Sequence, residues 1–132
     1  MRDKPLILLV DDELNFLEII GKKLAASGYD VITAQSGAEA IDLAQKRLPD
    51  LILMDIAMPD GTGTDAALII KQNPATRNLK IAFLSNMKDP WPRTSATPHS
   101  LAKEIGFEKF IDKAADLDTI TAEVEAVLAP KP

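Results

Sequence analysis

The chain has 132 residues, and 15 basic against 20 acidic side chains give it a formal net charge of -5. This length is typical of one domain with its own hydrophobic core, and the absence of cysteine excludes zinc fingers, iron–sulfur sites and thiol nucleophiles. The excess of acidic residues argues against a nucleic-acid partner. No apolar run approaches the roughly 18 residues of a membrane span, and no signal peptide opens the sequence, so we expect a cytoplasmic protein without a membrane partner.

Short apolar segments alternate with amphipathic segments along the chain. Leu6 to Val10 is the first apolar run, and it stops at Asp11. Such runs predict strands buried on both faces, whereas apolar residues at three- and four-residue intervals predict helices. The expected strands span residues 6–10, 29–34, 51–54, 80–84 and 108–112. The expected helices begin near residues 14, 36, 65, 99 and 117 and end near residues 27, 48, 72, 105 and 127.

This alternation predicts the fold class. Strands that alternate with helices form βα units, which build a parallel sheet with helices on both faces. We therefore expect an α/β protein with a flavodoxin-like, doubly wound (βα)5 fold. Such sheets bind ligands at the carboxyl ends of their strands, and the strand order 2-1-3-4-5 brings the ends of the first, third, fourth and fifth strands to one pocket.

Polar residues follow these four strands: Asp11 and Asp12, then Asp55, Ser85 and Lys113. Carboxylates gathered in one pocket repel one another unless a cation lies among them, and oxygen ligands without His or Cys favour Mg²⁺. A lysine and a serine hydroxyl suit the oxygens of a phosphoryl group. Each residue alone has an ordinary structural explanation; Asp12, for example, could cap the first helix. Together they suggest phosphoryl transfer to an Asp carboxylate.

Four segments of the sequence resemble the signature segments of the response-regulator receiver domain of two-component signalling. The resemblance covers about residues 5 to 129, nearly the whole chain. The segments are Leu8-Leu9-Val10-Asp11-Asp12-Glu13, Leu53-Met54-Asp55-Ile56-Ala57-Met58-Pro59, Leu84-Ser85 and Phe110-Ile111-Asp112-Lys113.

The resemblance implies a role for each matching residue. Asp55 would accept a phosphoryl group from a phosphohistidine on a sensor histidine kinase or a histidine phosphotransfer protein. Asp11 and Asp12 would bind Mg²⁺ together with the Asp55 carboxylate and the backbone carbonyl of Ala57, and Lys113 would contact the phosphoryl group. The protein would then be a phosphoacceptor that assists its own phosphorylation and dephosphorylation, and not an enzyme.

The resemblance also implies a two-state switch. Ser85 matches the hydroxyl that moves to bond the phosphoryl oxygen, and Phe110 matches the aromatic residue that swings inward with it. A downstream protein would bind the face formed by the fourth helix, the fifth strand and the fifth helix, together with the loop at residues 86–98. We expect residues 1–132 to form a single receiver without an output domain.

Three features depart from the family pattern. Ala114 follows Lys113, where the family generally has a proline after a cis peptide bond; a cis bond before alanine costs about 2.5–4 kcal/mol, so we expect a trans bond and a shifted loop. Asn86 replaces a small residue beside the phosphoryl position. Residues 88–93 lengthen a Pro-rich loop that contains Trp91.

Two other functions stay open from the sequence. The first is a receiver-like interaction module that acts without phosphorylation, which the departures at Ala114 and Asn86 allow. The second is a small phosphatase with an aspartyl nucleophile, of the haloacid-dehalogenase type. That class needs a second Asp two positions after the nucleophile, whereas Ala57 stands there after Asp55 and Glu13 stands there after Asp11.

Overall fold

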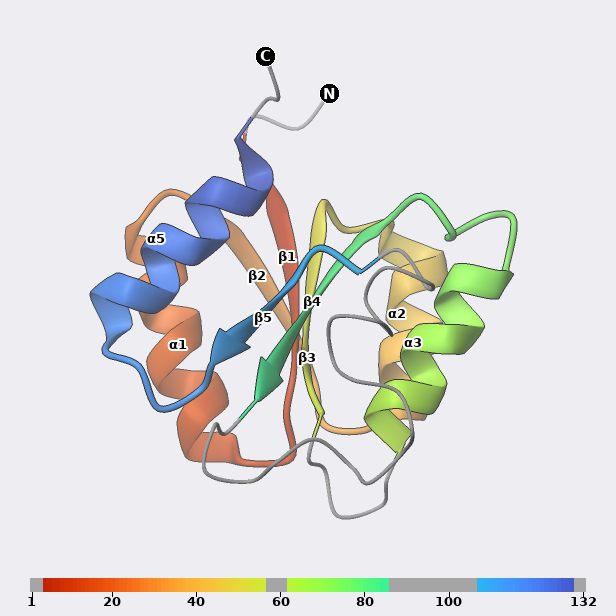
Figure 1. The fold of residues 1–132 in the computed structure, drawn as a ribbon, viewed down its shortest axis with the longest axis horizontal. Helices are drawn as coiled ribbons and strands as arrows, with labels where there is room; N and C mark the ends of the chain where they lie inside the picture. Colours follow the sequence, from red (N-terminus) through yellow and green to blue (C-terminus); the bar gives the residue numbers. More distant parts are fainter. Residues whose placement is uncertain (1–3, 57–61, 86–106, 130–132) are drawn as a thin grey trace.

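The computed structural model describes residues 4–56, 62–85 and 107–129, which form a parallel five-stranded sheet flanked by helices (Figure 1). The strand order is β2-β1-β3-β4-β5, so the predicted fold class and strand order are confirmed. The strands are β1 (Leu6–Val10), β2 (Asp30–Ala34), β3 (Leu51–Asp55), β4 (Lys80–Ser85) and β5 (Lys109–Asp112). The helices are α1 (Leu14–Ala26), α2 (Gly37–Arg47), α3 (Thr62–Gln72) and α5 (Leu117–Leu128).

The elements lie close to their predicted positions. The largest difference concerns α3, which begins at Thr62 and not near residue 65. The short helix expected at residues 99–105 lies outside the described residues, as do Asn86 and the Pro-rich loop with Trp91.

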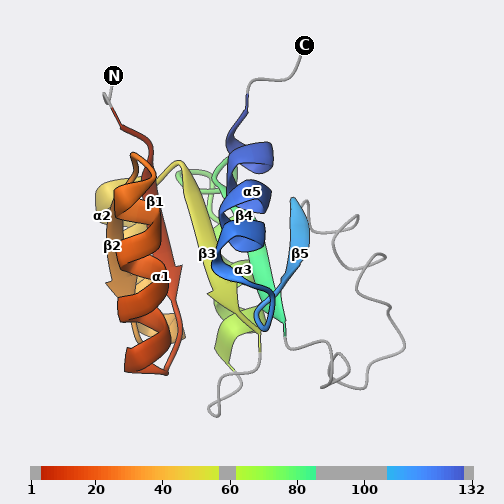
Figure 2. The same cartoon turned by 90° about the vertical axis from the view of Figure 1, so that its left-hand side faces the viewer.

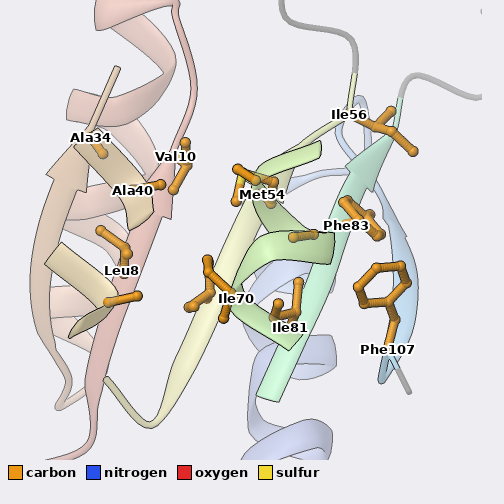
Figure 3. Close-up of a cluster of buried hydrophobic side chains, with 14 residues drawn as sticks. Leu8, Val10, Ala34, Ala40, Met54, Ile56, Ile70, Ile81, Phe83 and Phe107 are labelled. Atoms are coloured by element: carbon orange, nitrogen blue, oxygen red, sulfur yellow. The ribbon is translucent and has the colours of Figure 1, made fainter. Parts of the chain in front are cut away.

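Helices cover both faces of the sheet, with α1 and α5 on one side and α2 and α3 on the other (Figure 2). The side chains of β1 therefore divide between two cores. Leu8 and Val10 pack in the core beneath α2 and α3, which Figure 3 shows, and Ile7 and Leu9 pack in the core beneath α1 and α5. Because both faces are buried, the strand is apolar at every position and does not alternate.

Local signals in the sequence define where the helices begin and end. The Ser36 hydroxyl accepts a hydrogen bond from the Glu39 N–H at 3.2 Å, as in a capping box, and the Glu39 carboxylate accepts one from the N–H of Gln35, the residue before the N-cap. Asp116 caps α5 by accepting from the Thr119 N–H at 2.7 Å. After α1 the chain turns at Gly28, whose φ of 102° favours glycine.

Candidate functional site

The register of the sheet brings the predicted site residues to one edge. Val10 pairs with Met54, so the residues that follow them, Asp11 and Asp55, lie side by side where β1 and β3 end. Ser85 ends β4 opposite Asp112 of β5, one residue before Lys113. All lie at the carboxyl ends of the parallel strands, where open α/β sheets bind their ligands.

Asp11, Asp12 and Asp55 form an acidic pocket. One carboxylate oxygen from each lies within 4.8 Å of the others, and Asp11 and Asp55 are buried whereas Asp12 is exposed. The alternative role of Asp12 as the cap of α1 is wrong, because the N-cap position of that helix is Glu13.

Lys113 contacts two carboxylates of the acidic pocket. Its Nζ lies 2.8 Å from Asp11 Oδ2 and 3.3 Å from Asp55 Oδ2, so the ammonium contacts both buried carboxylates. It also donates to Glu13 Oε1 at 2.6 Å and lies 4.8 Å from the centre of the Phe16 ring. The peptide bond that follows Lys113 is trans, as predicted.

The buried carboxylate of Asp11 is only partly satisfied. Its Oδ1 accepts a hydrogen bond from the Glu13 N–H at 2.9 Å. Its Oδ2 is close to the Lys113 ammonium but outside hydrogen-bond alignment, and among the described residues it is the one buried side-chain oxygen or nitrogen without an aligned partner. A buried oxygen of this kind, among oxygen ligands alone, fits a hard cation such as Mg²⁺.

The pKa values of Asp11 and Lys113 reflect their burial and the excess of carboxylates over ammonium groups in the pocket. Burial, and to a smaller extent the charge of Asp55, raise the pKa of Asp11 to about 6, against the opposing effects of Lys113 and the Glu13 N–H. Burial acts to lower the pKa of Lys113, but the close carboxylates of Asp11 and Glu13 and the charge of Asp55 outweigh it and raise this pKa overall. The Asp11 shift therefore follows from burial, and the Lys113 shift from the several carboxylates that its ammonium faces.

Ser85 and Phe110 lie beside the pocket on β4 and β5. Ser85 is buried, and its carbonyl accepts a hydrogen bond from the Lys113 N–H at 3.0 Å. Phe110 lies two residues before the Ser85–Asp112 pair in the ladder, and its ring stacks on Phe83 with centres 5.6 Å apart. Ala57, the predicted backbone ligand, lies outside the described residues.

Two neighbours of Lys113 had no predicted role. Glu13 belongs to the run of three acidic residues, and Phe16 lies one helical turn later on α1. The available sequence signal was Glu13 itself, because Ser, Thr, Asp and Asn are the usual residues at a helix N-cap and Glu is not.

The fold and the site define a doubly wound α/β protein with an acidic pocket and a lysine at the carboxyl edge of its sheet. A sequence model described as the response regulator receiver domain matches residues 7–125. The chain belongs to this family, and it is a receiver domain of two-component signalling.

Related proteins agree with this assignment. The polar-differentiation response regulator DivK of Brucella ovis is 32% identical over 113 residues, which cover 83% of this chain and 91% of DivK. The receiver domain of HemR from Leptospira biflexa superposes with a TM-score of 0.81 at 29% identity and 98% coverage of both chains. The chemotaxis protein CheY4 of Vibrio cholerae gives a TM-score of 0.81 at 26% identity, with 95% of this chain and 99% of CheY4 covered.

Receiver domains are phosphoacceptors that interact with histidine kinases or phosphotransfer proteins, and they generally bind Mg²⁺ at an acidic pocket. In the part of the chain that the structure describes, no helix has the length and hydropathy of a membrane span.

Proposed function

We propose that this receiver accepts a phosphoryl group on Asp55 in a Mg²⁺-dependent phosphorelay. The observation that carries the proposal is the position of Asp55, a buried carboxylate at the end of β3 with Asp11 beside it and the Lys113 ammonium 3.3 Å away. Phosphoryl transfer depends on positioning and on neutralising charge, and these neighbours supply both.

The donor is a phosphohistidine of a sensor histidine kinase or a histidine phosphotransfer protein. A carboxylate oxygen of Asp55 attacks the phosphorus, a new O–P bond forms, and the P–N bond to the donor imidazole breaks. The imidazole leaves with that electron pair and takes up a proton. Hydrolysis of the acyl phosphate by water restores the Asp55 carboxylate, and the same pocket assists both steps.

Lys113 and Ser85 act on the transferred group. The ammonium of Lys113 pairs with a phosphoryl oxygen on Asp55, since it already lies within 3.3 Å of that carboxylate. The Ser85 hydroxyl donates to another phosphoryl oxygen. The backbone bond between Lys113 and Ser85, at 3.0 Å, fixes the two residues relative to each other.

Asp11, Asp12 and Asp55 would hold the Mg²⁺ ion, with the carbonyl of Ala57 as a further ligand. The three carboxylates and the buried Asp11 Oδ2 that lacks an aligned donor favour this ligand set. When bound, Mg²⁺ neutralises charge that develops on the phosphoryl oxygens. These carboxylates would hold the ion beside the buried Asp55 side chain.

The phosphoryl group then switches protein contacts. The hydrogen bond between the phosphoryl group and Ser85 favours a second conformation, in which Phe110 leaves its stack with Phe83 and turns inward. This bond can shift the population toward that conformation because it forms there and not in the unphosphorylated one. The changed surface includes β5 and α5, where a downstream protein binds. By the family resemblance the fourth helix, expected at residues 99–105, belongs to that surface, and we assign the 86–98 loop of this chain to it as well; both lie outside the described residues.

The test is incubation with Mg²⁺ and acetyl phosphate, followed by measurement of the intact mass. We expect one phosphoryl adduct on the native chain and none on the Asp55→Asn variant. The matched control is Asp65→Asn, the same change at an exposed position on α3, which should retain the adduct. The rate at which the adduct decays then measures autodephosphorylation.

Two results would replace the proposal. Repeated turnover of phosphomonoesters would favour the aspartyl phosphatase. Absence of an adduct with acetyl phosphate and with the cognate kinase would favour an interaction module that acts without phosphorylation.

A further inference from the structure

The Lys113 ammonium lies against two carboxylates of the acidic pocket. Its Nζ lies 2.8 Å from Asp11 Oδ2 and 3.3 Å from Asp55 Oδ2, two oxygens of the proposed Mg²⁺ ligand set. A cation that binds these oxygens must therefore compete with the ammonium. A group that draws Lys113 away from them would make the pocket easier to fill.

Glu13 lies where it can draw the Lys113 ammonium away from Asp11 and Asp55. Its contact with Lys113, at 2.6 Å, is the shortest of the three carboxylate contacts. The Glu13 side chain is 64% exposed, against 0% for Asp11 and 3% for Asp55, so it holds the ammonium from the solvent side. Phe16 adds a second outer partner, because its ring faces the ammonium at 4.8 Å.

The position of Glu13 in its helix supports a role outside the helix. Glu13 stands at the N-cap of α1, yet its side chain makes no capping hydrogen bond. Its backbone N–H is held by Asp11 Oδ1 at 2.9 Å, which fixes where the side chain starts. Glu is not a favoured residue at a helix N-cap, and the side chain of Glu13 instead contacts Lys113, 100 positions away in the sequence. The needs of the helix therefore do not explain a glutamate at this position.

We propose that Glu13 is a positioning residue that holds Lys113 at the outer side of the acidic pocket and so favours Mg²⁺ binding by Asp11, Asp12 and Asp55. This role rests on the proposed Mg²⁺ site. Without the Glu13 charge, Lys113 pairs more fully with Asp11 and Asp55 and competes more strongly with the ion. Glu13 thus raises the affinity of the pocket without contacting the cation.

The expected effect is modest, because the Glu13–Lys113 pair is partly exposed. Exposed ion pairs of this kind change an equilibrium by about two- to fivefold. We expect the Glu13→Gln variant, which keeps the shape of the side chain and removes its charge, to bind Mg²⁺ about two- to fivefold more weakly than the native chain.

The matched control is Glu18→Gln. Glu18 lies on α1, which Glu13 precedes; it is also 64% exposed and pairs with Lys22 at 3.1 Å. Both variants remove one negative charge in or next to α1, so a general charge effect would appear in both. The measurement is the dissociation constant of Mg²⁺ from titration calorimetry or from amide chemical shifts, with thermal unfolding as a check that each variant folds.

A double-mutant cycle tests whether Glu13 acts through Lys113. In a Lys113→Gln background, Glu13→Gln should change the Mg²⁺ affinity no more than Glu18→Gln does. An equal loss of affinity with and without Lys113 would overturn the proposal, because Glu13 would then act by its charge alone. Equal affinities of the native chain and Glu13→Gln would overturn it as well.

The same samples separate this inference from the proposed function. If Mg²⁺ binding responds to Glu13 through Lys113 but acetyl phosphate gives no adduct on Asp55, the phosphoacceptor role fails and the role of Glu13 holds. If the adduct forms and the cycle shows no coupling, the reverse is true. A native chain that binds no Mg²⁺ would overturn the role of Glu13.

Discussion

The two ends of the sheet use the same residue types in different ways. At the amino ends of the strands, Asp50 accepts a hydrogen bond from the Leu6 N–H at 2.7 Å, and Lys80 donates to the carbonyl of Val127 at 2.9 Å. At the carboxyl ends, Lys113 faces the carboxylates of Asp55 and of two other residues.

The partners explain the difference between the two ends. A charged group bound to backbone atoms is committed to the fold, because a buried backbone group left without a partner costs free energy. A charged group held by other side-chain charges can exchange them for a metal ion or a phosphoryl oxygen. Asp50 directly precedes β3 and Asp55 ends it, so residue type and nearness to a strand do not separate the two roles.

The largest expected difference between the two ends concerns their lysines. Lys113→Met leaves the buried Asp11 and Asp55 without their ammonium, and we expect a loss of about 3 kcal/mol in the free energy of unfolding without Mg²⁺. Lys80→Met frees only a carbonyl at the end of α5, and we expect about 1 kcal/mol or less. Urea denaturation of both variants measures the difference.

Addition of Mg²⁺ sharpens this comparison. The ion replaces the lost positive charge in the Lys113→Met variant and should restore part of its stability, whereas it should stabilise Lys80→Met and the native chain by similar amounts. If Lys113→Met is as stable as Lys80→Met in the absence of Mg²⁺, the charges at the carboxyl end of the sheet are not strongly coupled, and the comparison fails.

Asp50→Ala tests the amino end. The substitution removes the carboxylate that accepts from the Leu6 N–H, and Leu6 is buried, so we expect a loss of about 2 kcal/mol in the free energy of unfolding. Phosphorylation of Asp55 by acetyl phosphate should persist in the folded protein. If the folded Asp50→Ala variant forms no phosphoryl adduct, the two ends of the sheet are not separate in function.

Leu48 offers a smaller, stabilising change at the amino end. It ends α2 just before β3 with a φ of 46°, a left-handed conformation that costs an ordinary side chain free energy. Asn adopts this conformation more easily, and Leu48 is half exposed, so we expect Leu48→Asn to raise the free energy of unfolding by about 0.5 kcal/mol. A lower unfolding midpoint would instead assign Leu48 a packing role.

The smallest effect is a pH dependence at the carboxyl end. The hydrogen bond from the Thr119 N–H lowers the pKa of the Asp116 carboxyl below its ordinary value of 3.8. A lowered pKa in the folded state contributes stability above 3.8, and this contribution is lost as the pH falls through the lowered value. Asp116→Asn caps α5 without a charge, so its unfolding midpoint should fall less steeply in acid than that of the native chain.

Most of the fold could be predicted because each signal was local. The apolar run from Leu6 to Val10, the capping box at Ser36 and Glu39, and the glycine at the end of α1 each act over a few residues. The start of α3 was predicted too late, because Thr62 and Gly63 are weak helix formers that nevertheless adopt helical backbone there.

The site could be predicted in part, because strand register follows from the fold. Once β1 lies beside β3, Asp11 and Asp55 must be neighbours. The contact between Glu13 and Lys113 could not be predicted in this way. It depends on the path of the loop after β5 and on two long side chains, which neither hydrophobic period nor strand order determines.

The central place of β1 in the sheet also bears on how the chain folds. β1 pairs with β2 on one edge and with β3 on the other, and β3 lies some forty residues further along the chain. During synthesis this apolar segment therefore leaves the ribosome well before its second partner. Until β3 arrives, one edge and much apolar surface of β1 are open to other chains, so early folding is when this protein is most prone to aggregate.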